Sequence, residues 1–214
     1  MRYLFMGVIA PSFVLFPIIA AFFKYQVIKK EFKIFFYYLV LTALINGVSI
    51  YLAKRHIANL PLLHANTIIE AIILLYFFKL VFQGKAITKW IIGLMIAFPV
   101  FCCINFIFFQ SIHSFNTYSR PIEAVMFIVL CMMYYWYQDE NEQTVSWANN
   151  PLNWLISGLL LYFASEFLLF ISSNYLLTHF SIRVNEIIWN IHASFLIIMY
   201  ILFAIGFIKC KPKE

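Results

Sequence analysis

Seven apolar runs, each about 20 residues long, follow one another along this chain with only short polar segments between them. An α-helix of about 20 apolar residues crosses the roughly 30 Å hydrocarbon core of a bilayer. The sequence therefore predicts an all-α, polytopic membrane protein, with one transmembrane domain over residues 1–214 and a bundle of seven helices. The expected spans are 3–23, 34–53, 62–82, 90–110, 120–137, 151–172 and 186–208.

The composition agrees with membrane insertion. Of the 214 residues 64% are hydrophobic and 11% are charged, whereas soluble domains are closer to half apolar and a quarter charged. The net charge of +6 would suggest a nucleic-acid partner in a soluble protein. Here the lysines fall in short loops beside apolar runs, which indicates membrane orientation, so no nucleic-acid partner is expected.

Successive loops lie on alternate sides of the predicted membrane, and lysine and arginine are distributed unequally between these two sides. One side carries ten: Lys24, Lys29, Lys30, Lys33, Lys79, Lys85, Lys89, Lys209, Lys211 and Lys213. The other side carries five: Arg2, Lys54, Arg55, Arg120 and Arg183. Because basic residues favour the cytoplasmic side, the N-terminus is predicted outside and the C-terminus in the cytoplasm of a multi-pass inner-membrane protein.

Two polar triplets predict helix starts. Asn149 and Asn150 precede Pro151, an arrangement typical of an N-cap followed by proline in the first turn. Ser119, Arg120 and Pro121 open the fifth predicted span in a similar way.

Acidic, amide and imidazole side chains inside the spans gather toward the predicted outer ends, and the inner halves hold no acid. A charged side chain within a bilayer costs on the order of 3 kcal/mol, so such groups face the bundle interior and find partners. The pattern predicts an outward-facing polar pocket that binds a ligand. Its candidate residues are Asn46, Asn66, Glu70, Asn105, Glu123, Glu166, Glu186, Asn190 and His192.

Helical spacing limits how many of these residues share one face. Asn66 and Glu70 are one turn apart, and Glu186 and Asn190 form another such pair. His192 lies six residues after Glu186 and nearly opposite Asn190 on the helical wheel. A single tight site that uses every candidate is therefore not expected.

A metal site is a second hypothesis, with His64, Glu70 and His192 as ligands, because imidazole and carboxylate suit zinc or manganese. The chain has no HExxH motif and no cysteine pair at ligand spacing, so interhelical hydrogen bonds explain the histidines more simply. No cofactor is predicted. A divalent metal remains the alternative, and a metal bound here would activate water as in a membrane-embedded hydrolase. No catalytic residue is identified, and an enzyme is the less favoured interpretation.

A small transporter and a structural membrane subunit are also compatible with seven apolar spans. A proton or solute path across the membrane needs titratable groups in the inner half, and their scarcity there favours a one-sided pocket over transport. In a structural subunit the acids would only lock helices together, as the Arg120–Glu123 pair at i and i+3 would do.

Four stretches carry a resemblance to a known group: "NLPLLHANTIIE", "FNTYSRPIE", "WLISGLLLYFASEFLLF" and "IIWNIHASFLIIMYILFAIGF". Together they resemble small seven-helix inner-membrane proteins of Bacteroidota that have no assigned activity. The resemblance covers most of the chain from Asn59 onward and supplies no catalytic residues. By analogy with sensor histidine kinases it implies a sensory role.

The favoured hypothesis is a membrane sensor or receptor-like module that binds a small or lipid-like ligand. It implies membrane lipid and a cytoplasmic or membrane signalling protein as partners, and leaves a homo-oligomer open.

Overall fold

A computed structural model describes residues 4–139 and 146–211, and all regular secondary structure within those two ranges is helical. The predicted all-α class is thus confirmed for the described residues. Arg2 and Lys213, which entered the orientation argument, lie outside them.

The first predicted span consists of three consecutive helical pieces: η1 (Phe5–Ile9), α1 (Ala10–Ser12) and α2 (Leu15–Lys24). Six longer helices follow: α3 (Lys30–Lys54), α4 (Leu60–Val81), α5 (Ile87–Phe108), α6 (Ser119–Asp139), α7 (Pro151–His179) and α8 (Ile182–Ile208). A short 3-10 helix, η2 (Trp147–Asn149), precedes α7. The predicted boundaries hold to within a few residues except in α7, which extends past residue 172 to His179.

Side-chain caps fix the starts of three helices. The Oδ1 atom of Asn150 accepts a hydrogen bond from the backbone N–H of Leu152 at 3.1 Å, so the predicted cap of α7 is confirmed. The Oδ1 atom of Asn116 accepts from the backbone N–H of Ser119 at 3.1 Å where α6 begins. Ser181 accepts from Val184 at the start of α8.

Within the part of the chain that the structure describes, six helical segments are long and apolar enough to cross a membrane: Phe5–Lys24, Lys30–Lys54, Leu60–Val81, Ile87–Phe108, Pro151–Ser173 and Ile182–Ile208. The fifth predicted span, 120–137, forms α6 but is not among these six. Its first turns carry Arg120 and Glu123, and its last residues run Tyr-Tyr-Trp-Tyr-Gln-Asp, which lowers its hydropathy.

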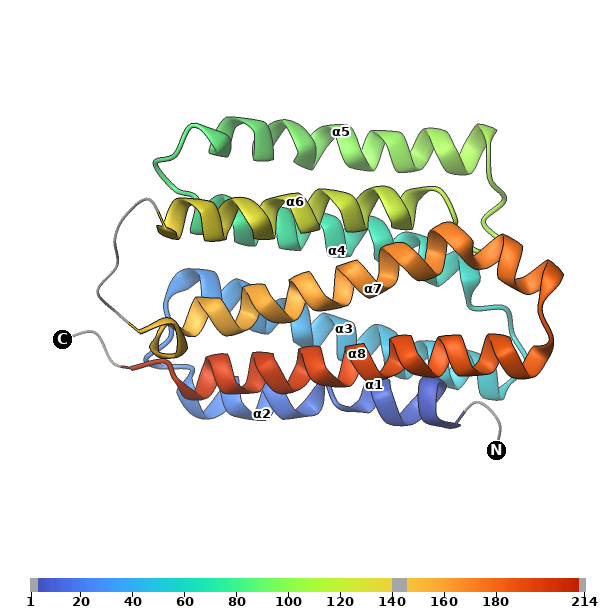
Figure 1. Cartoon of the computed structure of the whole chain (residues 1–214), viewed down its shortest axis with the longest axis horizontal. Helices are drawn as coiled ribbons and strands as arrows, with labels where there is room; N and C mark the ends of the chain where they lie inside the picture. The colour runs from blue at the N-terminus through green and yellow to red at the C-terminus, as the bar shows by residue number, and fades with distance from the viewer. Residues whose placement is uncertain (1–3, 140–145, 212–214) are drawn as a thin grey trace.

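The long helices lie lengthwise beside one another, and the two termini are at opposite ends of the bundle (Figure 1). In the bundle α7 packs between α6 and α8, α4 packs against both α3 and α5, and α2 packs on α8. We call the end with the α3–α4, α5–α6 and α7–α8 connections the outer end, after the orientation predicted from the lysines. The opposite end, which holds the C-terminus of α8, is the inner end.

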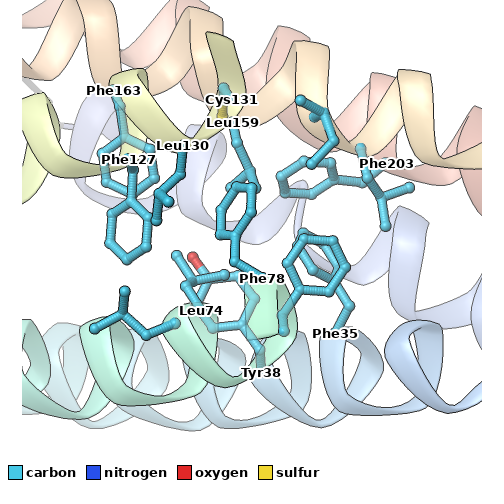
Figure 2. Close-up of a cluster of buried hydrophobic side chains, with 14 of the residues drawn as sticks. Phe35, Tyr38, Leu74, Phe78, Phe127, Leu130, Cys131, Leu159, Phe163 and Phe203 are labelled. Atoms are coloured by element: carbon cyan, nitrogen blue, oxygen red, sulfur yellow. The ribbon is translucent and has the colours of Figure 1, made fainter. Parts of the chain in front are cut away.

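The middle of the bundle is filled by aromatic side chains (Figure 2). The rings of Phe35 and Phe203 are 4.7 Å apart, and those of Phe127 and Phe163 are 4.8 Å apart, measured between centroids. Phe78 of α4 is also fully buried here. This apolar layer separates the polar groups of the outer end from those of the inner end.

Candidate functional site

One arginine joins three buried glutamates from three helices near the outer end. The Nη1 atom of Arg120 lies 2.8 Å from Glu70 Oε2 and 3.0 Å from Glu123 Oε2, and it donates a hydrogen bond to each. The same Nη1 atom is 3.1 Å from Glu166 Oε1. These four residues, Arg120, Glu70, Glu123 and Glu166, form what we call the acid cluster.

The helices explain how the acid cluster forms. Arg120 is the second residue of α6, and its long side chain reaches into the bundle from the helix start. Glu123 lies one turn further along α6. Glu70 on α4 and Glu166 on α7 face the same interior space because α6 packs against both of those helices. The predicted Arg120–Glu123 pair is present, but as part of a network of three helices.

Glu70 has the most partners of the three acids. The hydroxyl of Tyr38 donates to its Oε1 atom at 2.8 Å, and the amide of Asn66 donates to its Oε2 atom at 3.5 Å. Tyr38 was not predicted as a site residue. It lies eight residues before Asn46 on α3, about two helical turns away, so extending the search from Asn46 along its helix would have included it.

The acid cluster contains more acceptors than donors. Glu123 and Glu166 are fully buried, and Glu123 Oε1 and both oxygens of Glu166 have no hydrogen-bond partner. Glu166 interacts with Arg120 by charge at 3.1 Å, without hydrogen-bond geometry. Since buried polar atoms are normally paired, three carboxylates around one guanidinium leave room for protons or for a donor from outside the chain.

A cavity of about 650 Å³ borders the acid cluster at the outer end. Arg120, Tyr162 and His192 supply polar groups in its interior, and Asn185 and Glu186 lie on the first turns of α8. The rest of its wall is mostly apolar. The lining residues are Met6, Leu63, Phe115, Arg120, Tyr162, Phe170, Phe180, Ile182, Asn185, Glu186, Trp189, His192, Ala193 and Leu196.

Three aromatic rings form a continuous wall of this cavity. The indole of Trp189 lies 5.9 Å from the ring of Phe115 and 5.9 Å from that of Phe170, measured between centroids. The guanidinium carbon of Arg120 is 6.0 Å from the centroid of Phe170. The aromatic wall therefore ends beside the acid cluster.

The structure separates the predicted site residues into groups. Glu70, Glu123, Glu166 and Asn66 meet in or beside the acid cluster, whereas Glu186 and His192 line the cavity. Asn46 lies close to the side chain of Tyr200 on α8. The buried amide of Asn105 donates to Ser119 Oγ at 3.1 Å, which ties α5 to the start of α6.

Asn190 does not line the cavity, and its buried Oδ1 atom has no hydrogen-bond partner. The cavity face of α8 instead carries Asn185, Trp189 and His192. Spacing from Glu186 suggested Asn190 and disfavoured His192. The packing of α8 against α7 reverses that order.

The two candidate metal-binding histidines have other partners. The Nε2 atom of His64 lies 2.9 Å from the backbone oxygen of Ser114, and its ring lies 4.6 Å from that of Phe106. The Nδ1 atom of His192 lies 3.0 Å from Ser165 Oγ. Among the described residues, no three His, Cys, Asp or Glu side chains are placed to hold a metal ion. Glu70 is engaged by Arg120, so the predicted His64–Glu70–His192 set finds no support in the geometry.

A second polar network, not predicted from sequence, lies at the inner end. Tyr134 donates to Asn153 Oδ1 at 2.8 Å, and the Asn153 amide donates to the backbone oxygen of Trp147 at 2.9 Å. Tyr135 contacts the backbone oxygen of Asn153 at 3.1 Å and Ser157 Oγ at 2.6 Å. We call this the Asn153 network, and it is neutral. Asn153 lies inside the predicted span 151–172, and this polar position was the signal that could have indicated the network.

Cys210 lies beyond the end of α8 at the inner end and is buried. Burial raises the pKa of its thiol to about 12, so it stays protonated at neutral pH and is a poor nucleophile.

No family model, curated protein or solved structure matches this chain.

Proposed function

We propose that the protein is an integral membrane sensor or receptor-like module whose outer cavity binds a small amphiphilic or lipid-like molecule. The observation that carries this proposal is the cavity of about 650 Å³, with an aromatic wall that ends at a buried acid cluster. Ligand sites in proteins usually measure about 300–1,000 Å³ and combine apolar walls with a few polar groups.

The polar groups of the cavity favour a ligand with one polar part. Tyr162, His192 and Arg120 are side chains that hydrogen-bond, and they come from three different helices. A ligand that contacts all three would change the relative free energies of different packings of α6, α7 and α8. Ligand binding is thereby coupled to helix positions, which a sensor requires.

The apolar middle of the bundle favours sensing over transport. Phe35, Phe127, Phe163 and Phe203 separate the acid cluster from the Asn153 network, and that network contains no acid or base. A transported solute or proton needs polar groups along its route. We therefore propose that the ligand enters from the outer side and that a cytoplasmic or membrane partner reads the helix positions.

The direct test is to fill the cavity. Ala193 is buried and lines it, so Ala193→Phe places a ring inside the space that a ligand would occupy. The matched control is Ile191→Phe, because Ile191 lies on the same helix with an exposed side chain. Native mass spectrometry of wild type and both variants, purified gently in detergent, measures the bound species.

We expect a bound small molecule or lipid in the wild type and in Ile191→Phe, and its loss in Ala193→Phe. Equal occupancy in all three folded proteins would overturn the proposal. A wild type that carries no molecule, and gains none from an extract of its own membrane, would overturn it too.

A further inference from the structure

We propose that the inner end of the bundle binds the headgroup of an anionic phospholipid, where α2 and α8 end and α3 begins. This site lies at the opposite end from the outer cavity, so the inference goes beyond the proposed function and does not depend on the ligand proposed there. It follows from two adjoining cavities, from the lysines that line them and from the apolar side chains beside those lysines.

Two adjoining cavities lie at the inner end, where the ends of α2 and α8 meet the starts of α3 and α7 (Figure 1). The larger has a volume of about 420 Å³ and the smaller a volume of about 250 Å³. The two share four lining residues, so they form one depression, which we call the lysine pocket: Asn149, Lys209, Cys210 and Lys211. Its size falls in the range of ligand sites in proteins, about 300–1,000 Å³.

Basic side chains outnumber acidic ones around the lysine pocket. Four lysines line it: Lys24, Lys29, Lys209 and Lys211. Glu31 is the one described acid in its wall, and Asp139 at the end of α6 does not line it. Within residues 4–139 and 146–211, no ion pair or side-chain hydrogen bond engages the four ammonium groups.

The positive charge of the pocket exceeds the negative charge around it. The C-terminal ends of α2 and α8 each contribute only about half a negative charge, so with Glu31 they do not balance four lysines. Basic pockets between helices at the edge of a membrane bind anionic lipid headgroups. The local charge therefore favours an anion.

The start of α3 adds hydrogen-bond donors on the same side. Lys29 is its N-cap residue, and no side chain caps this end of the helix. Glu31 and Phe32, in the first turn, also line the pocket. The first N–H groups of a helix have no intrahelical partner, and phosphate oxygens accept hydrogen bonds from them. The helix start thus complements the lysines.

Apolar side chains beside the pocket favour a lipid over a free phosphate. Phe32 is buried in its wall. On the surface Phe23, which is 80% exposed, directly precedes Lys24, and Ile208, which is 60% exposed, directly precedes Lys209. In a bilayer such side chains contact acyl chains, while the neighbouring lysines extend to the headgroups. A phospholipid can then place its phosphate in the pocket and its chains along α2 and α8.

The test compares phosphatidylglycerol with phosphatidylcholine that carries the same acyl chains. Both lipids contain a phosphate, but only phosphatidylglycerol has a net negative charge. Binding to the detergent-purified protein is measured at pH 7 by native mass spectrometry, with the lipids added singly and in competition. We expect phosphatidylglycerol to bind at least about tenfold more tightly.

A double variant locates the bound headgroup. Lys29→Gln with Lys209→Gln removes two lysines of the pocket, and Lys85→Gln with Lys89→Gln makes the same charge change in the α4–α5 connection at the same end. Because each lysine near an anionic headgroup contributes about fivefold in affinity, the pocket double variant should bind phosphatidylglycerol about tenfold or more weakly. The control double variant should bind it as wild type does. Glu31→Gln removes the acid of the pocket and should strengthen binding about two- to fivefold.

Several outcomes would overturn the lipid inference. Equal affinities for the two lipids, or equal losses in the two double variants, would mean that only a diffuse basic surface attracts the headgroup. Weaker binding by Glu31→Gln would contradict the charge argument. Inorganic phosphate is the second probe: if it binds the pocket as tightly as phosphatidylglycerol does, the site takes a free phosphate and the lipid assignment is wrong.

Ala193→Phe separates this site from the outer cavity. Binding of phosphatidylglycerol should be unchanged in Ala193→Phe and weakened in the pocket double variant. The reverse result would place the lipid in the outer cavity, which overturns the inner site and leaves the proposed function intact. If the lysine pocket behaves as expected while Ala193→Phe retains every species that wild type carries, the proposed function fails and the lipid site stands.

Discussion

The acid cluster and the Asn153 network are both buried polar sites in an apolar bundle, but they differ in how fully they are paired. In the Asn153 network both the side-chain oxygen and the side-chain nitrogen of Asn153 are hydrogen-bonded, to Tyr134 and to the Trp147 backbone. In the acid cluster, three carboxyl groups share one guanidinium, and fully buried oxygens of Glu123 and Glu166 have no hydrogen-bond partner. A fully paired network is sufficient for a structural role. The unpaired acceptors of the acid cluster need protons or a donor from outside the chain.

The two ends also differ in how closely α7 and α8 approach. A Cβ atom added to Gly158 would lie 2.7 Å from the Phe203 ring, and one added to Gly206 would lie 3.0 Å from the backbone oxygen of Pro151. At the outer end the same two helices enclose the cavity with Phe170 and Trp189. The two helices pack tightly at Gly158 and Gly206, whereas at the outer end they enclose the cavity that borders the acid cluster, which is why we propose ligand binding there.

The largest expected effect comes from removing the shared cation. Arg120→Leu leaves three buried carboxyl groups without a counter-charge, and loss of one partner from a buried ion pair typically costs about 3–5 kcal/mol. Thermal unfolding in detergent should show a large loss at pH 7 and a smaller one at pH 5, because protonated carboxyls need no guanidinium. Arg55→Leu, at an exposed residue, is the control; an equal loss in both variants would contradict the central role of Arg120.

The next effect tests the fully paired network. Asn153→Leu removes the acceptor to which the Tyr134 hydroxyl donates and one donor to the Trp147 carbonyl, which should cost about 1–3 kcal/mol in unfolding free energy. Asn190→Leu is the matched control, since its side-chain oxygen has no partner to lose. Retention of cavity ligands by folded Asn153→Leu protein is expected; specific loss of ligand there would mean that the two ends are coupled.

A smaller effect is expected where α7 and α8 pack most closely. Gly206→Ala places a methyl group against Leu155, Pro151 and Trp154, and overpacking of this kind costs about 1–3 kcal/mol. Ala193→Val adds two methyl groups where the cavity has room, so its unfolding temperature should stay close to that of wild type. The comparison of the ends breaks down if Ala193→Val destabilises the protein more than Gly206→Ala does.

The smallest change in stability is expected from an acid that the cluster has in surplus. Glu166→Gln should alter the unfolding free energy by less than about 1 kcal/mol, because Arg120 keeps Glu70 and Glu123. Glu70→Gln should cost more, since Glu70 also accepts from Tyr38 and Asn66. Measured unfolding temperatures in the reverse order would show that Glu166 is the main partner of Arg120.

Particular residues show how far sequence reasoning reached. Glu70, Glu123 and Glu166 were recognised because a carboxyl in an apolar run is costly and must find partners. Arg120 was recognised as a local partner of Glu123 and as one of two arginines near the acids. Which carboxyls it joins was not predicted, since the reach of its side chain depends on how α6 sits between α4 and α7. The choice between His192 and Asn190 had the same difficulty: helical spacing ranks faces within one helix but does not say which face a neighbouring helix covers.

The sequence by itself determined the helical elements, their approximate ends and the position of each polar residue along its helix, because hydropathy and capping act within a single segment. The tertiary structure decided which of those residues share a site, which are fully paired and where a cavity remains. These properties depend on distances between side chains of different helices, and such distances are set by the packing of whole helices against one another. That packing joins Glu70 of α4 and Glu166 of α7 through Arg120 of α6, and it leaves Asn190 out of the cavity wall.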